Sequence, residues 1–190
     1  TFVIDDNGLT LTTASSGTNK MWVLSVGAFA GSGAGSCNVF DSTGSVCIWN
    51  VKPQNEMPSA FANGFQEWGI VGNVYGNTGA FVVLNTTASG GTHGGYATGE
   101  IGLSTHASEG SYTITSTGLP IEKRWYSWKI ENKTASSSLS VDGGLRATNT
   151  TTLMTPGGMQ PASYANRGGT GDASGVPQKA TVNYCEAYNT

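Results

Sequence analysis

The chain has 190 residues, a formal net charge of −3 and only 11% charged residues, against about 25% in a typical soluble domain. Its basic residues form no block that would neutralise a run of phosphates, which argues against nucleic-acid binding, and no apolar run approaches the length needed to span a membrane. The length suits one domain over residues 1–190, and the aromatic content of 9% argues against intrinsic disorder.

The first half of the chain has the short alternating runs and turn residues of a β-protein. Phe2 and Ile4 alternate with polar or turn residues, and Leu9 and Leu11 repeat the pattern after a predicted tight turn at residues 6–8. An Asn-Gly pair there tolerates the positive φ that a hairpin turn needs. One short helical turn is predicted at residues 56–63. Further strands are predicted at Trp22–Ala28, Val46–Val51, Gly69–Tyr75, Ala80–Asn85, Tyr96–Leu103 and Ser111–Ser116.

The second half continues the pattern, with strands predicted at Trp125–Glu131, Leu139–Val141 and Ala180–Tyr188. In the last strand Glu186 interrupts a face made by Ala180, Val182, Tyr184 and Tyr188. Residues 155–176, which are rich in Gly and contain two prolines, predict a long surface loop. Many short strands at regular spacing predict an all-β fold, a sandwich or jelly roll of two antiparallel sheets.

One segment, residues 125–143, has a more specific pattern than the rest of the chain. Residues 125–131 read Trp-Tyr-Ser-Trp-Lys-Ile-Glu, and residues 139–143 read Leu-Ser-Val-Asp-Gly. This segment resembles the laminin-G-like and concanavalin-A-like β-sandwich superfamily, in which a strand opening with Trp leads into such a Leu-x-Val-Asp-Gly strand, although Tyr126 stands where the family often has His. The resemblance implies recognition of a glycan or protein at loop rims or on a concave sheet face, sometimes with calcium.

The three cysteines allow two interpretations. Cys37 and Cys47 flank a short Gly/Ser/Asp segment, and we expect them to form a disulfide because other features indicate an oxidising compartment; Cys185 is then left over. The alternative is three buried free thiols. No Cys/His spacing resembles a zinc site, and His93 and His106 are the only histidines.

Three Asn-x-Thr sequons are candidate glycosylation sites and favour an extracellular or surface location. Their asparagines are Asn85, Asn132 and Asn149. In a chain so rich in Thr and Asn, some of these sequons will arise by chance. We expect no cofactor, with calcium left open as a ligand of loop carboxylates. The carboxylates concerned, each also explained by turn formation, are Asp5, Asp6, Asp41 and Asp172.

Aromatic side chains beside hydroxyl and amide groups are typical of glycan sites, because such groups bond sugars without charge. The residues predicted to bind ligand are Trp49, Trp68, Tyr75 and Trp128. For these four, core packing is an equally good interpretation. For Trp22 and Trp125 core packing is preferred.

The acidic residues and histidines give weaker indications of catalysis. Glycoside hydrolases need two facing carboxylates, which only separate strands could bring together here, Glu67 with Glu100 for example. Polysaccharide lyases abstract a proton with residues such as His and Tyr. The corresponding residue types are His93, His106, Tyr96 and Tyr112, and we interpret both histidines as surface residues.

The sequence therefore favours a non-enzymatic extracellular or surface module that binds a glycan or protein partner. A self-assembling subunit of a filament, surface layer or virion is the close alternative, with residues 1–13 pairing to the sheet edge of a neighbouring copy. A polysaccharide-active lyase or hydrolase is third. The organism, the ligand and the oligomeric state do not follow from the sequence.

Overall fold

The computed structural model of the chain describes the strands and the turns closest to them. The described residues are 2–13, 21–25, 40–41, 44–54, 65–71, 78–85, 99–108, 111–154, 158–166 and 178–190. None of these residues forms a helix long and apolar enough to span a membrane. The predicted helical turn at 56–63 lies outside the described residues.

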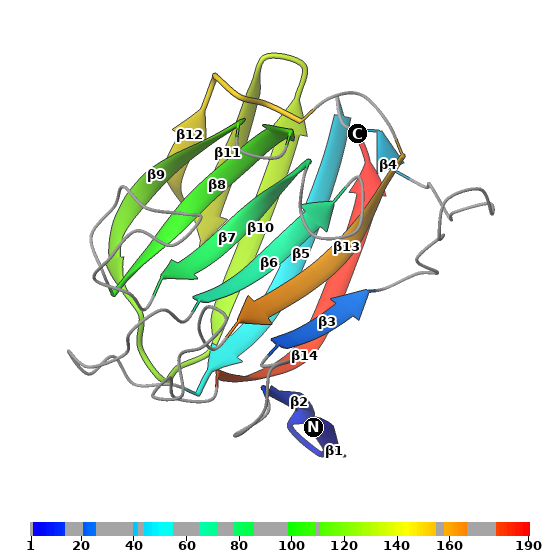
Figure 1. Cartoon of the computed structure of the whole chain (residues 1–190), viewed down its shortest axis with the longest axis vertical. Coiled ribbons are helices and arrows are strands. Elements are labelled where there is room, and N and C mark those ends of the chain that lie inside the picture. The colour runs from blue at the N-terminus through cyan, green and yellow to red at the C-terminus, as the bar shows by residue number, and fades with distance from the viewer. Residues whose placement is uncertain are drawn as a thin grey trace.

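The described residues form fourteen strands in two antiparallel sheets that pack face to face (Figure 1). The first sheet has the order β1 (Phe2–Asp5), β2 (Gly8–Thr12), β14 (Lys179–Asn189), β5 (Gly44–Pro53), β10 (Tyr126–Lys133), β11 (Ser136–Val141) and β12 (Gly144–Asn149). The second sheet has the order β3 (Met21–Ser25), β13 (Gly158–Asn166), β6 (Phe65–Val71), β7 (Gly79–Asn85), β8 (Glu100–Ser108) and β9 (Ser111–Pro120), and β4 (Phe40–Asp41) also pairs with β13. The predicted two-sheet jelly-roll sandwich is confirmed.

A core of alternate side chains from both sheets holds the sandwich together. Its centre is a row of indole rings: Trp68 from the second sheet contacts Trp49 at 5.4 Å and Trp128 at 6.4 Å between ring centroids. Tyr126 stacks on Trp128 at 5.8 Å. Fully burying one large apolar side chain stabilises a fold by about 1.5–3 kcal/mol. The other core side chains with almost no exposure include Val51, Ile70, Val82, Leu84, Ile101, Leu103, Ile130 and Leu139.

Buried asparagine side chains tie strands together where the core becomes polar. The Asn149 side-chain amide at the end of β12 donates to the Leu103 carbonyl at 3.3 Å, the Thr105 hydroxyl at 3.0 Å and the Thr113 carbonyl at 3.1 Å. Its oxygen accepts from the Thr115 hydroxyl at 2.6 Å. Because β12 belongs to the first sheet and these partners lie on β8 and β9, Asn149 links the two sheets.

A bulge in β14 changes which of its residues face the core. Ala180 and Val182 point inward, but the pairing with β5 shifts between Val182 and Tyr184. After the shift Cys185 packs against the core and Tyr184 is exposed. The predicted face joining Ala180 to Tyr188 is therefore wrong, and Glu186, which interrupted that face in the sequence, points outward with the two tyrosines.

The predicted surface loop at 155–176 contains a strand, β13. On one side β13 pairs with β6, and in that pairing Pro161 is opposite Ile70. On the other side β4 pairs only with Gly158 and Met159, and β3 pairs only from Ala162 onward. Pro161 stands in the gap between those two partners, so its missing N–H breaks no ladder there.

The predicted N-terminal hairpin is confirmed. Residues 2–12 form the β1–β2 hairpin, which lies at one end of the sandwich in Figure 1. Asp142 and Gly143, with φ of 51° and 82°, form the turn between β11 and β12. Trp125 is half-buried and precedes β10. The residues of β10 that face the core are Tyr126, Trp128 and Ile130.

Candidate functional site

The second sheet carries chemically active side chains on the face that points away from the core, which we call the outer face. Alternation along β7 sends Ala80, Val82 and Leu84 into the core, and Phe81 to the outer face. The pairing register places Ser104 of β8 opposite Phe81, and His106 opposite both Gly79 of β7 and Tyr112 of β9. Three adjacent strands thus bring Phe81, Ser104, His106 and Tyr112 together, and we call these four residues the His106 cluster.

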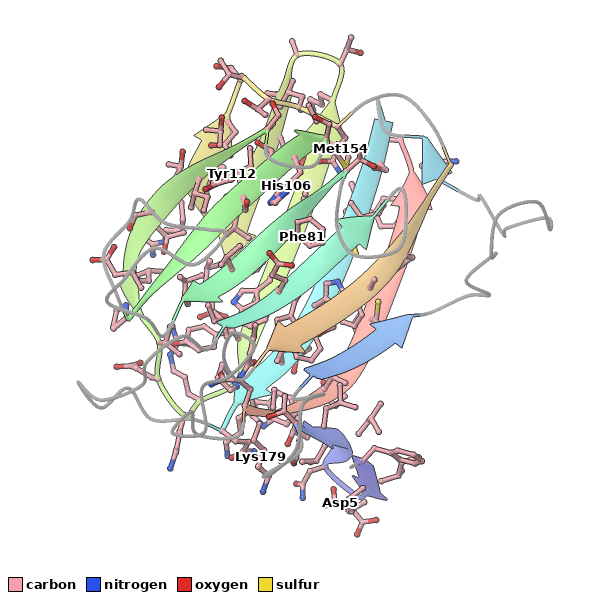
Figure 2. The ribbon with its side chains drawn as sticks, viewed as in Figure 1. Asp5, Phe81, His106, Tyr112, Met154 and Lys179 are labelled. Carbon is pink, nitrogen blue, oxygen red and sulfur yellow. The ribbon has the colours of Figure 1, made fainter. Side chains whose placement is uncertain are left out.

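His106 has a fixed orientation within this cluster. One ring nitrogen, Nε2, lies 2.8 Å from the Ser104 hydroxyl oxygen. The imidazole stacks on Tyr112 with ring centroids 5.4 Å apart, and it meets the Phe81 ring edge-to-face at the same distance. Figure 2 shows the three rings grouped over the β7–β9 part of the sheet. The imidazole is 6% exposed, whereas Tyr112 is half-buried and reaches the surface.

Gly79 provides the room that this arrangement requires. A Cβ atom at Gly79 would lie 2.6 Å from the Phe81 ring and 2.6 Å from the Ile70 carbonyl oxygen. Real Cβ atoms do not approach other heavy atoms so closely, so the Phe81 ring can lie over this position only because it is glycine. The glycine at the start of β7 therefore allows the packing of Phe81 against His106.

Two carboxylates share the outer face with the cluster. Glu67 of β6 is opposite Val83 and almost fully buried. Glu100 at the start of β8 is half-buried and accepts a hydrogen bond from the Ser116 hydroxyl on β9. Because β7 lies between them and they are offset by two residues, their Cα atoms are about 12 Å apart. Glu67 and Glu100, the example given of two carboxylates on separate strands, thus lie on the same face of the sheet but are too far apart for direct contact.

The tryptophans predicted to bind ligand lie elsewhere, and this prediction is contradicted by their burial. Trp49, Trp68 and Trp128 are 0% exposed between the sheets. The Trp49 indole N–H donates to the Gly69 carbonyl at 3.2 Å, and that of Trp68 donates to the Gln66 side chain at 3.4 Å. Their positions in β5, β6 and β10 have inward register, so core packing is the correct interpretation. Tyr75 lies outside the described residues, as do His93 and Tyr96, and the side chain of Trp22 is also outside them.

Two of the three predicted glycosylation sites are also contradicted. Asn132 and Asn149 are 1% and 2% exposed. The Asn132 amide donates to Ser45 at 3.2 Å and its oxygen accepts from Ser137 at 2.7 Å, while Asn149 makes the inter-sheet bonds described above. An attached glycan would break these buried bonds. Asn85 ends β7, and its side chain lies outside the described part of the chain.

Cys47 is a free thiol in this structure and not half of a disulfide. Its side chain faces the core and donates to the Gly69 carbonyl at 3.6 Å. Cys185 is also free and is half-buried. Cys37 lies outside the described residues, so the Cys37–Cys47 bridge stays a prediction.

Of the loop carboxylates considered for calcium, the structure describes the side chains of Asp5 and Asp6. Asp5 accepts a hydrogen bond from the Asn7 amide at 2.8 Å, which is the turn-forming role expected of Asp at this position. Among the described residues no three His, Cys, Asp or Glu side chains lie close enough together to hold a metal ion. Asp6 is exposed, the Asp41 side chain and Asp172 lie outside the description, and calcium binding stays a prediction.

Sequence reasoning named His106 and Tyr112 but placed His106 on a surface between strands. The structure places it inside β8, on the side opposite the main core. Residues 104–106, Ser-Thr-His, carry the alternation that signals this, since Thr105 is bonded to Asn149 of the other sheet and its neighbours must point outward. Only the pairing register shows that Phe81 and Tyr112 flank the imidazole.

The comparisons with known proteins agree with this fold. No family model matches the chain, and neither does any curated protein. Among solved structures it is similar to the carbohydrate-binding module CBM66 from Bacillus subtilis, with a TM-score of 0.60 and 10% identity over 100% of this chain and 91% of that chain. It is similar to the Bacillus licheniformis β-glucanase, with a TM-score of 0.56 and 16% identity over 96% and 78%.

A third similar structure is an alginate lyase of polysaccharide lyase family 7, with a TM-score of 0.62 and 9% identity over 100% of this chain and 82% of that chain. At these identities the likeness establishes the fold alone. The chain has the concanavalin-like jelly-roll fold that these carbohydrate-binding and polysaccharide-active proteins share.

Proposed function

We propose that this protein binds a polysaccharide through the outer face of its second sheet, at the His106 cluster and the neighbouring Glu100–Ser116 pair. The observation that carries the proposal is the grouping of Tyr112, His106 and Phe81 on one face with a fixed hydroxyl at Ser104. Aromatic rings beside hydroxyl and carboxylate oxygens form the apolar and polar contacts that sugars need.

The residues of this face fall into a buried group and a half-buried group that reaches the surface. Phe81, Ser104 and His106 are buried and hold the positions of the others. Tyr112, Ile114, Ser116 and Glu100 are half-buried and present atoms to the surface along β9 and the start of β8. An extended polymer lying along β9 would contact these four side chains in succession.

The proposal includes an extracellular or surface setting, where structural polysaccharides are found. The similar solved structures include carbohydrate-binding and polysaccharide-cleaving proteins, which supports a glycan partner. The laminin-G-like affinity of residues 125–143 and assembly through residues 1–13 stay predictions. In the structure Phe2, Val3 and Ile4 are exposed on the edge strand β1.

Cleavage of the bound polysaccharide is a second candidate function, favoured by one observation. The Ser104 hydroxyl orients a histidine that stacks on a tyrosine, and His and Tyr are residues that transfer protons near neutral pH. Incubation with soluble polysaccharides, followed by assays for new reducing ends and for unsaturated sugars, tests this candidate. Sustained product formation that a His106→Gln variant loses would establish an enzyme.

Binding is tested by affinity electrophoresis in gels containing neutral or acidic polysaccharides. We expect one or more polymers to retard the protein, and Tyr112→Ala and Glu100→Gln to weaken the retardation at least tenfold in polymer concentration. Tyr188→Ala is the matched control, because Tyr188 is an exposed tyrosine on the first sheet. Thermal unfolding confirms that each variant is folded. If Tyr112→Ala and Glu100→Gln were retarded as strongly as Tyr188→Ala and the wild type, the result would contradict binding at the proposed face.

A further inference from the structure

Two free cysteines lie on neighbouring strands of the first sheet and face the same side. In the pairing of β5 with β14, Cys47 is opposite Ala187 and Cys185 is opposite Trp49. The two cysteines are therefore diagonal neighbours, offset by two residues. Cys47 belongs to the core and Cys185 packs against it, so both thiols point toward the space between the sheets.

The strand pairing brings the two thiols near each other. Interaction with the Cys185 thiol, and then burial, raises the pKa of Cys47 well above its usual value, so this thiol is protonated at neutral pH. Cys185 is half-buried and is the one of the two that a soluble reagent can reach.

We propose that Cys47 and Cys185 are the disulfide-forming pair of this protein, and that their bridge fastens β14 to β5 across the bulge. The inference does not depend on the proposed glycan-binding function. It replaces the Cys37–Cys47 pairing that sequence spacing suggested, and it accounts for two cysteines that the outer face of the second sheet does not use.

The geometry of the sheet is compatible with the bridge. Diagonal neighbours on antiparallel strands have Cα atoms about 7–8 Å apart, and bridged cysteines have them about 4.4–6.8 Å apart. The two Cα atoms must therefore approach by roughly 1–2 Å. The bulge between Val182 and Tyr184 lies next to Cys185, and such an irregularity lets one strand bend.

The bonding partners of Cys47 also tolerate oxidation. Its S–H donates to the Gly69 carbonyl, but the same oxygen accepts the Trp49 indole N–H at the shorter distance of 3.2 Å. Loss of the thiol proton therefore leaves the Gly69 carbonyl hydrogen-bonded, so forming the bridge orphans no buried acceptor.

The reaction with a disulfide oxidant such as oxidised glutathione proceeds by thiol exchange. The Cys185 thiolate attacks one glutathione sulfur, forming a mixed disulfide and releasing one glutathione thiolate. Cys47 then loses its proton to solvent and attacks the Cys185 sulfur, releasing the second glutathione. The protein loses two electrons and two protons, and one oxidised glutathione becomes two reduced molecules.

The test is disulfide mapping of the full chain after incubation with oxidised glutathione. Free thiols are alkylated, and the protein is cleaved before aspartates under non-reducing conditions. Cleavage before Asp41 separates Cys37 from Cys47, and cleavage before Asp172 isolates the peptide with Cys185. We expect the Cys47 and Cys185 peptides to be linked, with the mass of two hydrogens lost, and Cys37 to be alkylated.

A link from Cys37 to either other cysteine would overturn the inference, as would alkylation of all three. Cys37→Ser should leave the link intact, whereas Cys185→Ser should abolish it. Reduction should lower the thermal midpoint of the oxidised wild-type protein and leave that of Cys185→Ser unchanged. The mapping uses the wild-type chain, so it remains decisive if a variant folds poorly.

Discussion

Asn149 belongs to a glycosylation sequon, but its buried side-chain amide stabilises the fold. It makes four hydrogen bonds to β8 and β9 while it belongs to β12. A buried group left without its partner costs about 1–3 kcal/mol. Asn149 therefore contributes to stability by hydrogen-bonding to two backbone carbonyls and two threonine hydroxyls of the other sheet.

We expect Asn149→Ala to lower the free energy of unfolding by about 2–3 kcal/mol, because it removes all four bonds and leaves a void. Urea denaturation measures this. Thr148→Ala is the matched control, since Thr148 is the exposed neighbour on the same strand, and it should change stability by less than about 0.5 kcal/mol. Equal effects of the two substitutions would contradict the structural role.

The charged carboxylate of Asp142 also stabilises the local structure. Partial burial raises the pKa of its carboxyl, but the hydrogen bond from the Ser127 amide and the ion pair with Arg124 outweigh this and lower the pKa overall. The folded-state pKa thus lies below the unfolded value of about 3.9. The carboxylate contributes stability above that value and loses the contribution as the pH falls through the folded-state pKa.

We therefore expect Asp142→Asn to be less stable than the wild type near neutral pH by less than about 1 kcal/mol, since the pair is exposed and screened. The difference should shrink below about pH 4 and in high salt. Chemical denaturation at a series of pH values measures it, with Glu122→Gln as the control for the other carboxylate that contacts Arg124. A difference that grew as the pH fell would contradict the assignment.

At the scale of the strands, β6 contains the closest backbone approach that the structure describes around a glycine. A Cβ at Gly69 would lie 2.0 Å from the Ala80 carbonyl oxygen of β7. The carbonyl of the same glycine accepts hydrogen bonds from Trp49 and Cys47 of the opposite sheet. Gly69 therefore determines both how β6 meets β7 and how β6 is joined to β5.

We expect Gly69→Ala to destabilise the protein by about 1–3 kcal/mol or more, because backbone must move to admit the methyl group. Gly144→Ala serves as control, since its Cβ would meet no atom closer than 3.5 Å. Intrinsic tryptophan fluorescence during urea unfolding reports both the stability and the surroundings of Trp49. If Gly69→Ala were as stable as Gly144→Ala, the close approach would be refuted.

The strands also show what the sequence alone could predict. Alternation located β10 and β11, because one face of each is apolar, and runs of consecutive apolar residues located β5 and β7. It missed β13, whose Pro161 argues against a strand unless the gap between its partners is known. It misjudged β14, because a bulge inverts the faces, and Glu186 marked an interruption of the pattern without showing that the register shifts.

The candidate site was harder to predict than the strands for a related reason. Tryptophans resemble glycan platforms, but their register in β5, β6 and β10 turns them inward. His106 and Tyr112 were identifiable only as residue types, since their contact depends on how β8 pairs with β9. Pairing between strands is a long-range property, and spacing along the chain does not encode it directly.

For the whole molecule, two sheets packed around a tryptophan row leave two outer faces with different chemistry. The first sheet presents exposed Tyr184 and Tyr188 with lysines that pair to Glu131. The second sheet presents the His106 cluster and the two carboxylates Glu67 and Glu100. Because a jelly roll is shared by binding proteins and enzymes alike, the function depends on the side chains that each outer face presents and not on the fold.

The most direct test is hydrogen–deuterium exchange of the protein with and without a polysaccharide that retards it in gels. Our account predicts that binding slows exchange in β8 and β9, around His106 and Tyr112, and leaves β14 and β10 unchanged. Protection confined to β14, β5 or β10 would place the polysaccharide on the first sheet and contradict the account.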